Sequence, residues 1–488
     1  MAKKKGAQKN KRKKQQLQKA GPRKPLNTSI HALGSLTVAM MVKNEEYFIE
    51  DAIKSALKVA DEVVIVDTGS TDRTIEIIQR YPVKLRHFEW NDDFSAARNE
   101  TIKHSTSDWI LVLDADERVV IQNSNLKSLK VGLKQAEQSG IHIILININN
   151  RFLDGRLIDN FSNGRIFINN GLLKYRNRVH ERLDIADPES NAVVKHTSMN
   201  GLHIDHFGYD PNIYKGRNKS DRSLPLIEKM LEDDPNDMEF QCFLGREFVI
   251  KKDYERARVE LEKAVFGRFD GHKNFFVESL KLLLFTYKAL EVSTEHILTF
   301  AELGIQEEPT QPDFWLYKGQ ALALDPNQSQ EAIRFLKKGQ ALLKTYVAKD
   351  TSYTHPFFMT RQHLIHDLIG ELHEQRGEFS DAYHEFIKLT DMPTHVTINR
   401  EGLYNKLIQL AIKLEDHELV KSHIKGLLNL PQNTFAGLYY YGQHLLNQRE
   451  YTKTQELLEW AMSISTRCKT HPQTQKLLER LVTEQTAN

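Results

Sequence analysis

Apolar residues in the first part of the chain alternate between short continuous runs and stretches of helical spacing. The β-rich runs are LTVAMMV (36–42), EVVIVD (62–67), VKLRHFE (83–89) and DWILVLD (108–114). Segments with apolar positions at helical spacing separate them, and we expect Asn44 to cap the first helix, over 44–60. This β-α-β-α-β-α-β order predicts a mostly parallel sheet, in which ligands bind beyond the carboxyl ends of the strands.

The next part of the chain, from 141 to 208, has a different pattern. The short β-like runs IHIILININN, GRIFINN and NGLHIDHF are separated by turns rich in Gly and Asn. They predict a mixed-sheet second half, so the fold class of residues 34–220 is a Rossmann-like α/β domain with a mixed, mostly parallel sheet.

Strand signals end near residue 222, and small or apolar residues then recur at fixed offsets. The marks are Leu244, Gly245, Phe248, Ala257, Leu261 and Ala264; then Ile369, Gly370, His373, Ala382, Phe386 and Leu389; then Tyr441, Gly442, Leu445, Thr454, Leu458 and Ala461. A looser copy starts near Trp315. One copy alone could be an ordinary helical hairpin, but three in register predict tetratricopeptide-like repeats over 221–488. Stacked repeats form a concave face that commonly binds peptide or protein, and their exposed faces are compatible with a homodimer.

Charge is distributed unevenly along the chain. Residues 1–33 hold eleven Lys and Arg and no acidic residue, so we expect a disordered basic tail, and the rest of the chain is acidic. The tail is either a weak electrostatic contact for nucleic acid or an anionic membrane, or a solubilising segment without a partner. Cys242 and Cys468 have no metal-ligand spacing, and no apolar run is long enough to span a bilayer. A cytoplasmic protein is therefore expected.

Two acids follow the fourth predicted strand. At a strand-to-loop junction Asp114 and Asp116 can both face a divalent cation such as Mn²⁺ or Mg²⁺, which neutralises a diphosphate. Asp-X-Asp alone is also common in solvated loops, and its place at the sheet edge strengthens the prediction. Asp67 ends the second strand and could accept hydrogen bonds from a base or ribose. Alternatively, Asp67 or Ser70 caps the next helix.

The motifs MMVKNEE, VDTGSTD, FSAARNE and WILVLDADE, in this order, resemble glycosyltransferase family 2, which has the GT-A fold. RNRVHE (176–181), HIDHFGY (203–209) and KGRN (215–218) resemble its subgroup with tetratricopeptide repeats, which includes bacterial enzymes that glycosylate peptides, among them the cysteine of bacteriocin precursors. The resemblance implies an inverting, metal-dependent transfer from a UDP-sugar to a peptide or protein. It also implies that Asp67 contacts the uracil, Arg98 and Lys43 the nucleotide, Asp114 the ribose and metal, and Asp116 the metal.

Glu181 is the predicted catalytic base, because an inverting transfer needs one carboxylate near the acceptor to take up its proton. It could equally be a structural partner of Arg176 and Arg178, and Glu117 and Asp205 are alternative bases.

His206 is a predicted metal ligand, although a single histidine is more often simply packed. Arg217, with Lys215 and Lys219, could clamp the diphosphate or could belong to a solvated linker.

Two other classes of function compete with the transferase. The first is a repeat adaptor whose α/β domain binds a nucleotide without catalysis. The second is a nucleotidyltransferase, but MMVKNEE lacks the Gly-rich phosphate loop expected after the first strand.

Overall fold

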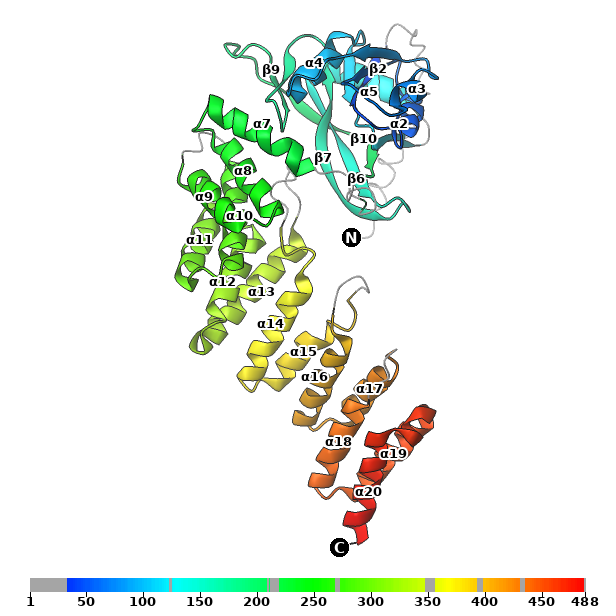
Figure 1. Ribbon diagram of the computed structural model, residues 1–488, viewed down its shortest axis with the longest axis vertical. Coiled ribbons are helices and arrows are strands. Elements are labelled where there is room, and N and C mark those ends of the chain that lie inside the picture. The colour runs from blue at the N-terminus through cyan, green and yellow to red at the C-terminus, as the bar shows by residue number, and fades with distance from the viewer. Residues whose placement is uncertain are drawn as a thin grey trace, which may run out of the picture. The chain divides into compact units, whose positions relative to one another are not determined.

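The computed structural model describes residues 33–122, 125–208, 210, 219–267, 273–346, 356–392, 398–430 and 435–486. The chain divides into two compact units, Met1–Met230 and Leu231–Asn488. The first is an α/β domain and the second is all helical, as Figure 1 shows, which confirms the predicted fold class. The basic tail predicted over 1–33 lies, apart from its last residue, outside the described residues.

An eight-stranded sheet organises the first unit, in the order β3-β2-β1-β4-β7-β6-β10-β5. Its strands are β1 (Leu36–Val42), β2 (Glu62–Asp67), β3 (Lys84–His87), β4 (Trp109–Val112), β5 (Glu117–Ile121), β6 (Ile143–Arg151), β7 (Leu157–Ile168) and β10 (His196–His206). β1 to β4 pair in parallel, with Val42 opposite Asp67 and Ala39 opposite Val112, while β7 pairs antiparallel with β4 and β6. The strand runs predicted from the sequence therefore form one sheet.

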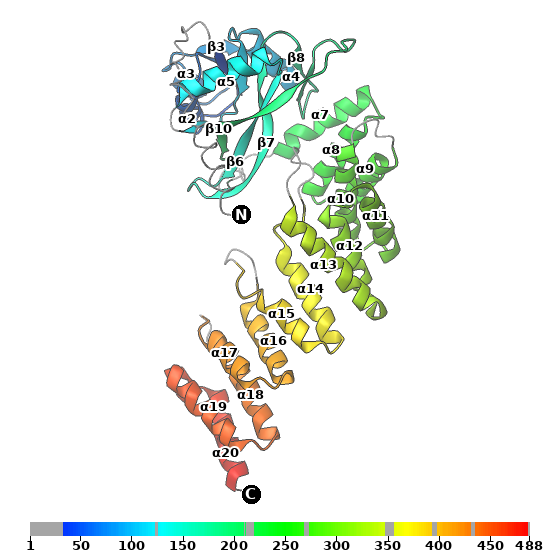
Figure 2. The ribbon, with the colours of Figure 1, turned by 180° about the vertical axis from the view of Figure 1, so that it is seen from behind.

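Helices and a hairpin cover the two faces of this sheet, and Figure 2 shows them from behind. Apolar side chains of α2 (Ile49–Ala56), α3 (Thr74–Ile78) and α5 (Leu126–Gln138) pack on one face, in the same cluster as alternate residues of β1. On the other face, α4 (Phe94–Lys103) lies with the hairpin of β8 (Leu173–Arg176) and β9 (Arg182–Ile185). Successive side chains of β1 point to opposite faces of the sheet, so this strand contributes to both apolar layers.

The local structure at Asn44 differs from the prediction. The helix begins at Ile49, and Asn44 adopts a left-handed conformation with φ of 56°. Its side-chain oxygen accepts a hydrogen bond from the backbone N–H of Thr71 at 2.7 Å. The prediction of an N-cap was wrong because Asn44 joins the ends of β1 and β2 instead of starting the helix.

The second unit is a series of helix pairs. After α7 (Lys219–Asp233) come α8 (Met238–Ile250), α9 (Tyr254–Phe266), α10 (Lys273–Ala289), α11 (Thr294–Glu307), α12 (Pro312–Leu322), α13 (Ser329–Thr345), α14 (Gln362–Gln375), α15 (Phe379–Ile387), α16 (Arg400–Lys413), α17 (His417–Leu428), α18 (Ala436–Asn447), α19 (Tyr451–Ile464) and α20 (Pro472–Thr486). Among the described residues, no helix combines the length and apolar content needed to cross a bilayer.

Close glycine contacts explain the repeat pattern. A Cβ on Gly245 of α8 would lie 2.6 Å from Leu261 of α9, and one on Gly370 of α14 would lie 2.8 Å from Phe386 of α15. The three predicted copies correspond to the pairs α8–α9, α14–α15 and α18–α19, and the looser copy near Trp315 corresponds to α12–α13. Further pairs, α10–α11 and α16–α17, form without the small-residue marks at those offsets.

We expect Gly319→Ala to destabilise the repeats, although alanine normally favours a helix. The new Cβ would lie 2.6 Å from Leu336 Cγ and 3.0 Å from its backbone nitrogen, so the helices must separate at a cost of about 1–3 kcal/mol. Thermal unfolding followed by circular dichroism at about 222 nm measures this, as the helical signal dominates there. Gly132→Ala is the control, because its Cβ meets only the flexible end of Met199 at 3.2 Å. An unchanged melting profile for Gly319→Ala would contradict the packing argument.

Candidate active site

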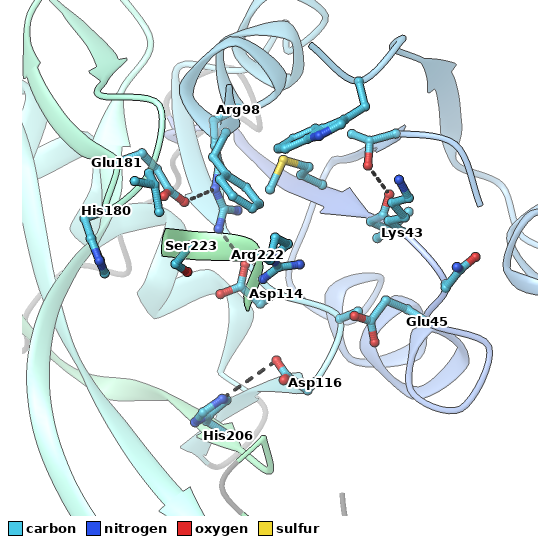
Figure 3. A pocket seen from close by; sticks show the side chains of 18 residues that line it. Lys43, Glu45, Arg98, Asp114, Asp116, His180, Glu181, His206, Arg222 and Ser223 are labelled. Carbon is cyan, nitrogen blue, oxygen red and sulfur yellow. Dashed lines mark hydrogen bonds and ion pairs between the residues drawn. The ribbon is translucent and has the colours of Figure 1, made fainter. Parts of the chain in front are cut away.

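A cavity of about 570 Å³ lies at the carboxyl ends of the parallel strands. Residues that follow β1, β2 and β4 contribute to it, as parallel-sheet topology predicts. Its lining comprises Met41, Val42, Lys43, Asn44, Glu45, Thr68, Trp90, Phe94, Arg98, Asp114, Ala115, Asp116, Val179, His180, Glu181, His206, Arg222 and Ser223. Figure 3 shows these side chains facing one space, although they come from distant parts of the sequence.

The acidic loop after β4 is held in shape by Glu117. The Glu117 carboxylate accepts a hydrogen bond from the backbone N–H of Asp114 at 2.8 Å, and its other oxygen accepts one from Arg165 at 2.7 Å. Burial raises the pKa of Glu117 to about 7, helped by repulsion from Asp114 and opposed by Arg165. Glu117 does not line the cavity, so its position favours a structural role over that of the alternative base.

Arg98 connects two of the predicted site residues. Its guanidinium, which is 8% exposed, donates to Asp114 at 2.7 Å and to Glu181 at 3.3 Å. Burial alone would raise the pKa of Asp114, but Arg98 and Arg165 outweigh it and hold that pKa well below its usual range. The Nη1 of Arg98 is buried and has no hydrogen-bond partner among the described residues. One donor of this arginine is therefore left unsatisfied inside the protein.

Glu181 reaches the cavity from the loop between β8 and β9. The carbonyl groups of Asn177 and Arg178 accept hydrogen bonds from Ser95 Oγ at 2.5 Å and from the Phe94 N–H at 2.8 Å, which fastens this loop to the start of α4. Asn177 and His180 have left-handed backbones, with φ of 74° and 52°. Such strained residues persist where the surroundings fix them, often at functional sites.

Arg176, one of the two alternative partners suggested for Glu181, contacts other groups. Arg176 donates to the carbonyl of Ile185, within the β8–β9 hairpin, and the hydrogen bond to Glu181 comes from Arg98. Asp205, the other alternative base, is held by Arg151 at 2.6 Å and lies outside the lining.

Asp116 and His206 form the second charged part of the site. His206 Nε2 lies 3.8 Å from Asp116 Oδ1, while His206 Nδ1 bonds to the side-chain oxygen of Asn150 at 2.7 Å. An Nδ1–H donated to Asn150 leaves the Nε2 lone pair facing Asp116, the arrangement that metal-binding histidines adopt. A Cβ on Gly208 would lie 2.5 Å from Asp116 Oδ2 and 2.6 Å from His206 Nε2. Gly208 therefore packs closely against both donor atoms, and a carboxylate beside an imidazole nitrogen is a donor set that fits a hard or borderline divalent cation.

The structure separates Asp67 from this cavity. Asp67 is 1% exposed, and its carboxylate accepts hydrogen bonds from the N–H groups of Gly69 at 3.0 Å and Ser70 at 3.1 Å. It shapes the turn after β2, and the neighbouring Thr68 lines the cavity instead. Neither Asp67 nor Ser70 caps α3, because Asp72 accepts the hydrogen bond of the Thr74 N–H.

Lys43 is exposed at the cavity edge, and Arg217 lies outside the described residues together with Lys215. The sequence analysis did not predict the aromatic residues Trp90 and Phe94 of the cavity lining. Phe94 and Trp90 stack edge to face at 4.7 Å, and the Arg222 guanidinium lies 4.9 Å from the Phe94 ring centre. Trp90 precedes the motif FSAARNE and Arg222 lies in α7, which also belongs to the first unit up to Met230, so no shared sequence pattern linked the two residues.

Comparison with known proteins matches the same part of the chain. Residues 37–178 match the family model described as Glycosyl transferase family 2. A TPR repeat-containing protein of Synechococcus elongatus is 29% identical over 238 residues, which are 48% of this chain and 57% of that protein. The SPbeta prophage-derived glycosyltransferase SunS of Bacillus subtilis is 29% identical over 254 residues, 51% of this chain and 58% of that protein.

The chain therefore spans somewhat more than half the length of these curated relatives. Among solved structures, the match to MamA covers 37% of this chain and 92% of the MamA chain, with 16% sequence identity and a TM-score of 0.29. The family match covers β1 to β8, which carry most of the cavity. Residues 37–178 thus match glycosyltransferase family 2, and a series of helix pairs follows them in the chain.

Proposed function

We propose that this chain is an inverting, metal-dependent glycosyltransferase that moves a sugar from a UDP-sugar to a peptide or protein acceptor. The observation that carries the proposal is the meeting of Asp114, Asp116, Arg98, Glu181 and His206 around one cavity of a family 2 domain. An adaptor that only binds nucleotide would not need an acid beside an open cavity.

Asp116 and His206 would hold the cation, with Asp114 beside them. A bound Mn²⁺ or Mg²⁺ would neutralise the charge that develops on the departing diphosphate. The Nη1 of Arg98 offers an unused donor for a nucleotide oxygen, while Lys43 at the cavity edge and Arg217 would add positive charge. Asp67 would act on the uracil through the turn that it holds.

Glu181 would act as the base. The acceptor oxygen or sulfur forms a bond to the anomeric carbon, the bond from that carbon to the diphosphate breaks, and the acceptor proton passes to Glu181. Arg98 holds Glu181 from the side of Asp114, so the same guanidinium fixes the base relative to the donor. The acceptor residue is Ser, Thr or Cys, and the helical repeats engage the rest of the acceptor.

Metal-dependent release of UDP tests the enzyme class. With a panel of UDP-sugars and Mn²⁺ or Mg²⁺, we expect the wild-type protein to release UDP from at least one donor, and chelation to stop the release. Asp116→Asn should lower the rate by about 100-fold or more, because charge neutralisation at the leaving group is lost. Asp187→Asn, an exposed change of the same kind, should leave it unchanged. Full activity of Asp116→Asn would refute the metal assignment, and no binding of any donor would favour the adaptor.

Glu181→Gln tests the base separately from donor binding. We expect kcat for transfer to fall by about 100-fold while UDP-sugar affinity, measured by calorimetry, stays within a few-fold, since a base acts on the acceptor. The matched variant Asp205→Asn should retain turnover. If Glu181→Gln lowers the melting temperature but retains kcat, Glu181 is a structural partner of Arg98.

Gly208→Ala tests the metal site without relying on turnover. Its methyl group would occupy the space between Asp116 and His206, so we expect Mn²⁺ affinity to fall by about tenfold or more, read from the electron paramagnetic resonance signal of free Mn²⁺. Gly132→Ala serves as the control. Unchanged Mn²⁺ binding in Gly208→Ala would place the cation elsewhere.

A further inference from the structure

A second cavity, of about 300 Å³, lies within the helical repeats between α14, α15 and α16. Its floor is apolar and is formed by Leu364, Phe386, Leu389 and Leu403, of which Phe386 and Leu389 are almost fully buried. This volume accommodates a large aliphatic side chain. Leu364 is 46% exposed, so part of the apolar surface remains open to solvent.

The rim of this cavity carries two acids on one helix face. Asp367 and Glu371 are one turn apart on α14, where like charges repel. Burial raises the pKa of Asp367, and burial together with Asp367 raises the pKa of Glu371, both opposed by Lys406. Both residues are exposed, so their side chains are accessible to a cation from solvent.

The nearby lysines are already engaged by another acid. Glu374 accepts hydrogen bonds from Lys406 at 2.8 Å and from Lys413 at 3.0 Å. Within the part of the chain that the structure describes, no ion pair within 4.0 Å involves Asp367 or Glu371. Lys406 and His363 also line the cavity, and Lys406 partly offsets the charge of the two acids while it is bound to Glu374. The rim thus keeps an excess of acidic over lysine side chains beside an apolar floor.

We propose that this cavity docks a basic polypeptide segment in which a large aliphatic residue is flanked by Lys or Arg. The aliphatic side chain fills the apolar floor, and a neighbouring cation meets Asp367 and Glu371. The acidic rim repels phosphate groups, so charge complementarity opposes nucleic acid and anionic lipid at this place. This docking site lies within the repeats and does not involve the residues assigned to sugar transfer.

Fluorescence anisotropy of a labelled peptide with the full chain tests the proposal. The probe is Gly-Ser-Lys-Lys-Leu-Lys-Lys-Ser-Gly, compared with a peptide in which serine replaces leucine and one in which glutamate replaces each lysine. We expect the first peptide to bind most tightly and the glutamate peptide not to bind. The affinity of the lysine-leucine probe should fall with added salt, since part of the attraction is between exposed charges.

The double variant Asp367→Asn with Glu371→Gln should weaken binding of the probe by about tenfold, because two charge contacts are lost. The control is Glu255→Gln with Glu418→Gln, which removes the same charge from acids that are 69% and 85% exposed elsewhere in the repeats. Equal weakening by both double variants, no preference for leucine over serine, or no binding of the probe would overturn the proposal. None of these outcomes depends on UDP-sugar binding, so a failure here is distinguishable from a failure of the transferase assignment.

Discussion

One buried arginine, Arg98, and one partly buried arginine, Arg165, hold the acids around the cavity in place. Arg98 bridges Asp114 and Glu181, and Arg165 bridges Asp114 and Glu117. Removing a partner from the most buried of these pairs leaves the remaining charge without compensation, which destabilises the folded state. The acidic loop, the start of α4 and the β8–β9 loop are therefore fixed relative to one another by a single network. Asp116 belongs to the same acidic loop, so the ion-pair network also fixes its position beside His206.

The division of labour between the two units follows from their architecture. The parallel strands bring loop residues together at one edge, which suits a site built from precise polar contacts. The repeats instead stack helix pairs through glycine contacts and leave surfaces for recognition. Under the proposed function, the first unit would carry the transfer chemistry and the repeats would contact the acceptor.

Periodicity was sufficient to predict most of the fold, because β1 to β4 are separated by amphipathic segments and the repeat marks fall on buried positions. It missed β5, which is short, follows the acidic loop directly and pairs antiparallel with the distant β10. Within the site, residues next to conspicuous motifs were found. Arg165 and Gly208 were not predicted. Arg165 lies within β7 and outside the motifs, and Gly208 is important only because its backbone packs close to Asp116 and His206. The orientation of Asp67 could not be predicted either, because a polar residue at a strand end can turn back onto its own loop.

The central claim is that this cavity holds a divalent cation and the diphosphate of a nucleotide-sugar. Anomalous diffraction from crystals grown with Mn²⁺ and UDP tests it most directly, since it locates the cation independently of activity. The account predicts one strong peak between Asp116 and His206, with UDP phosphates beside it and near Arg98. A peak elsewhere, or UDP bound outside the cavity, would contradict it.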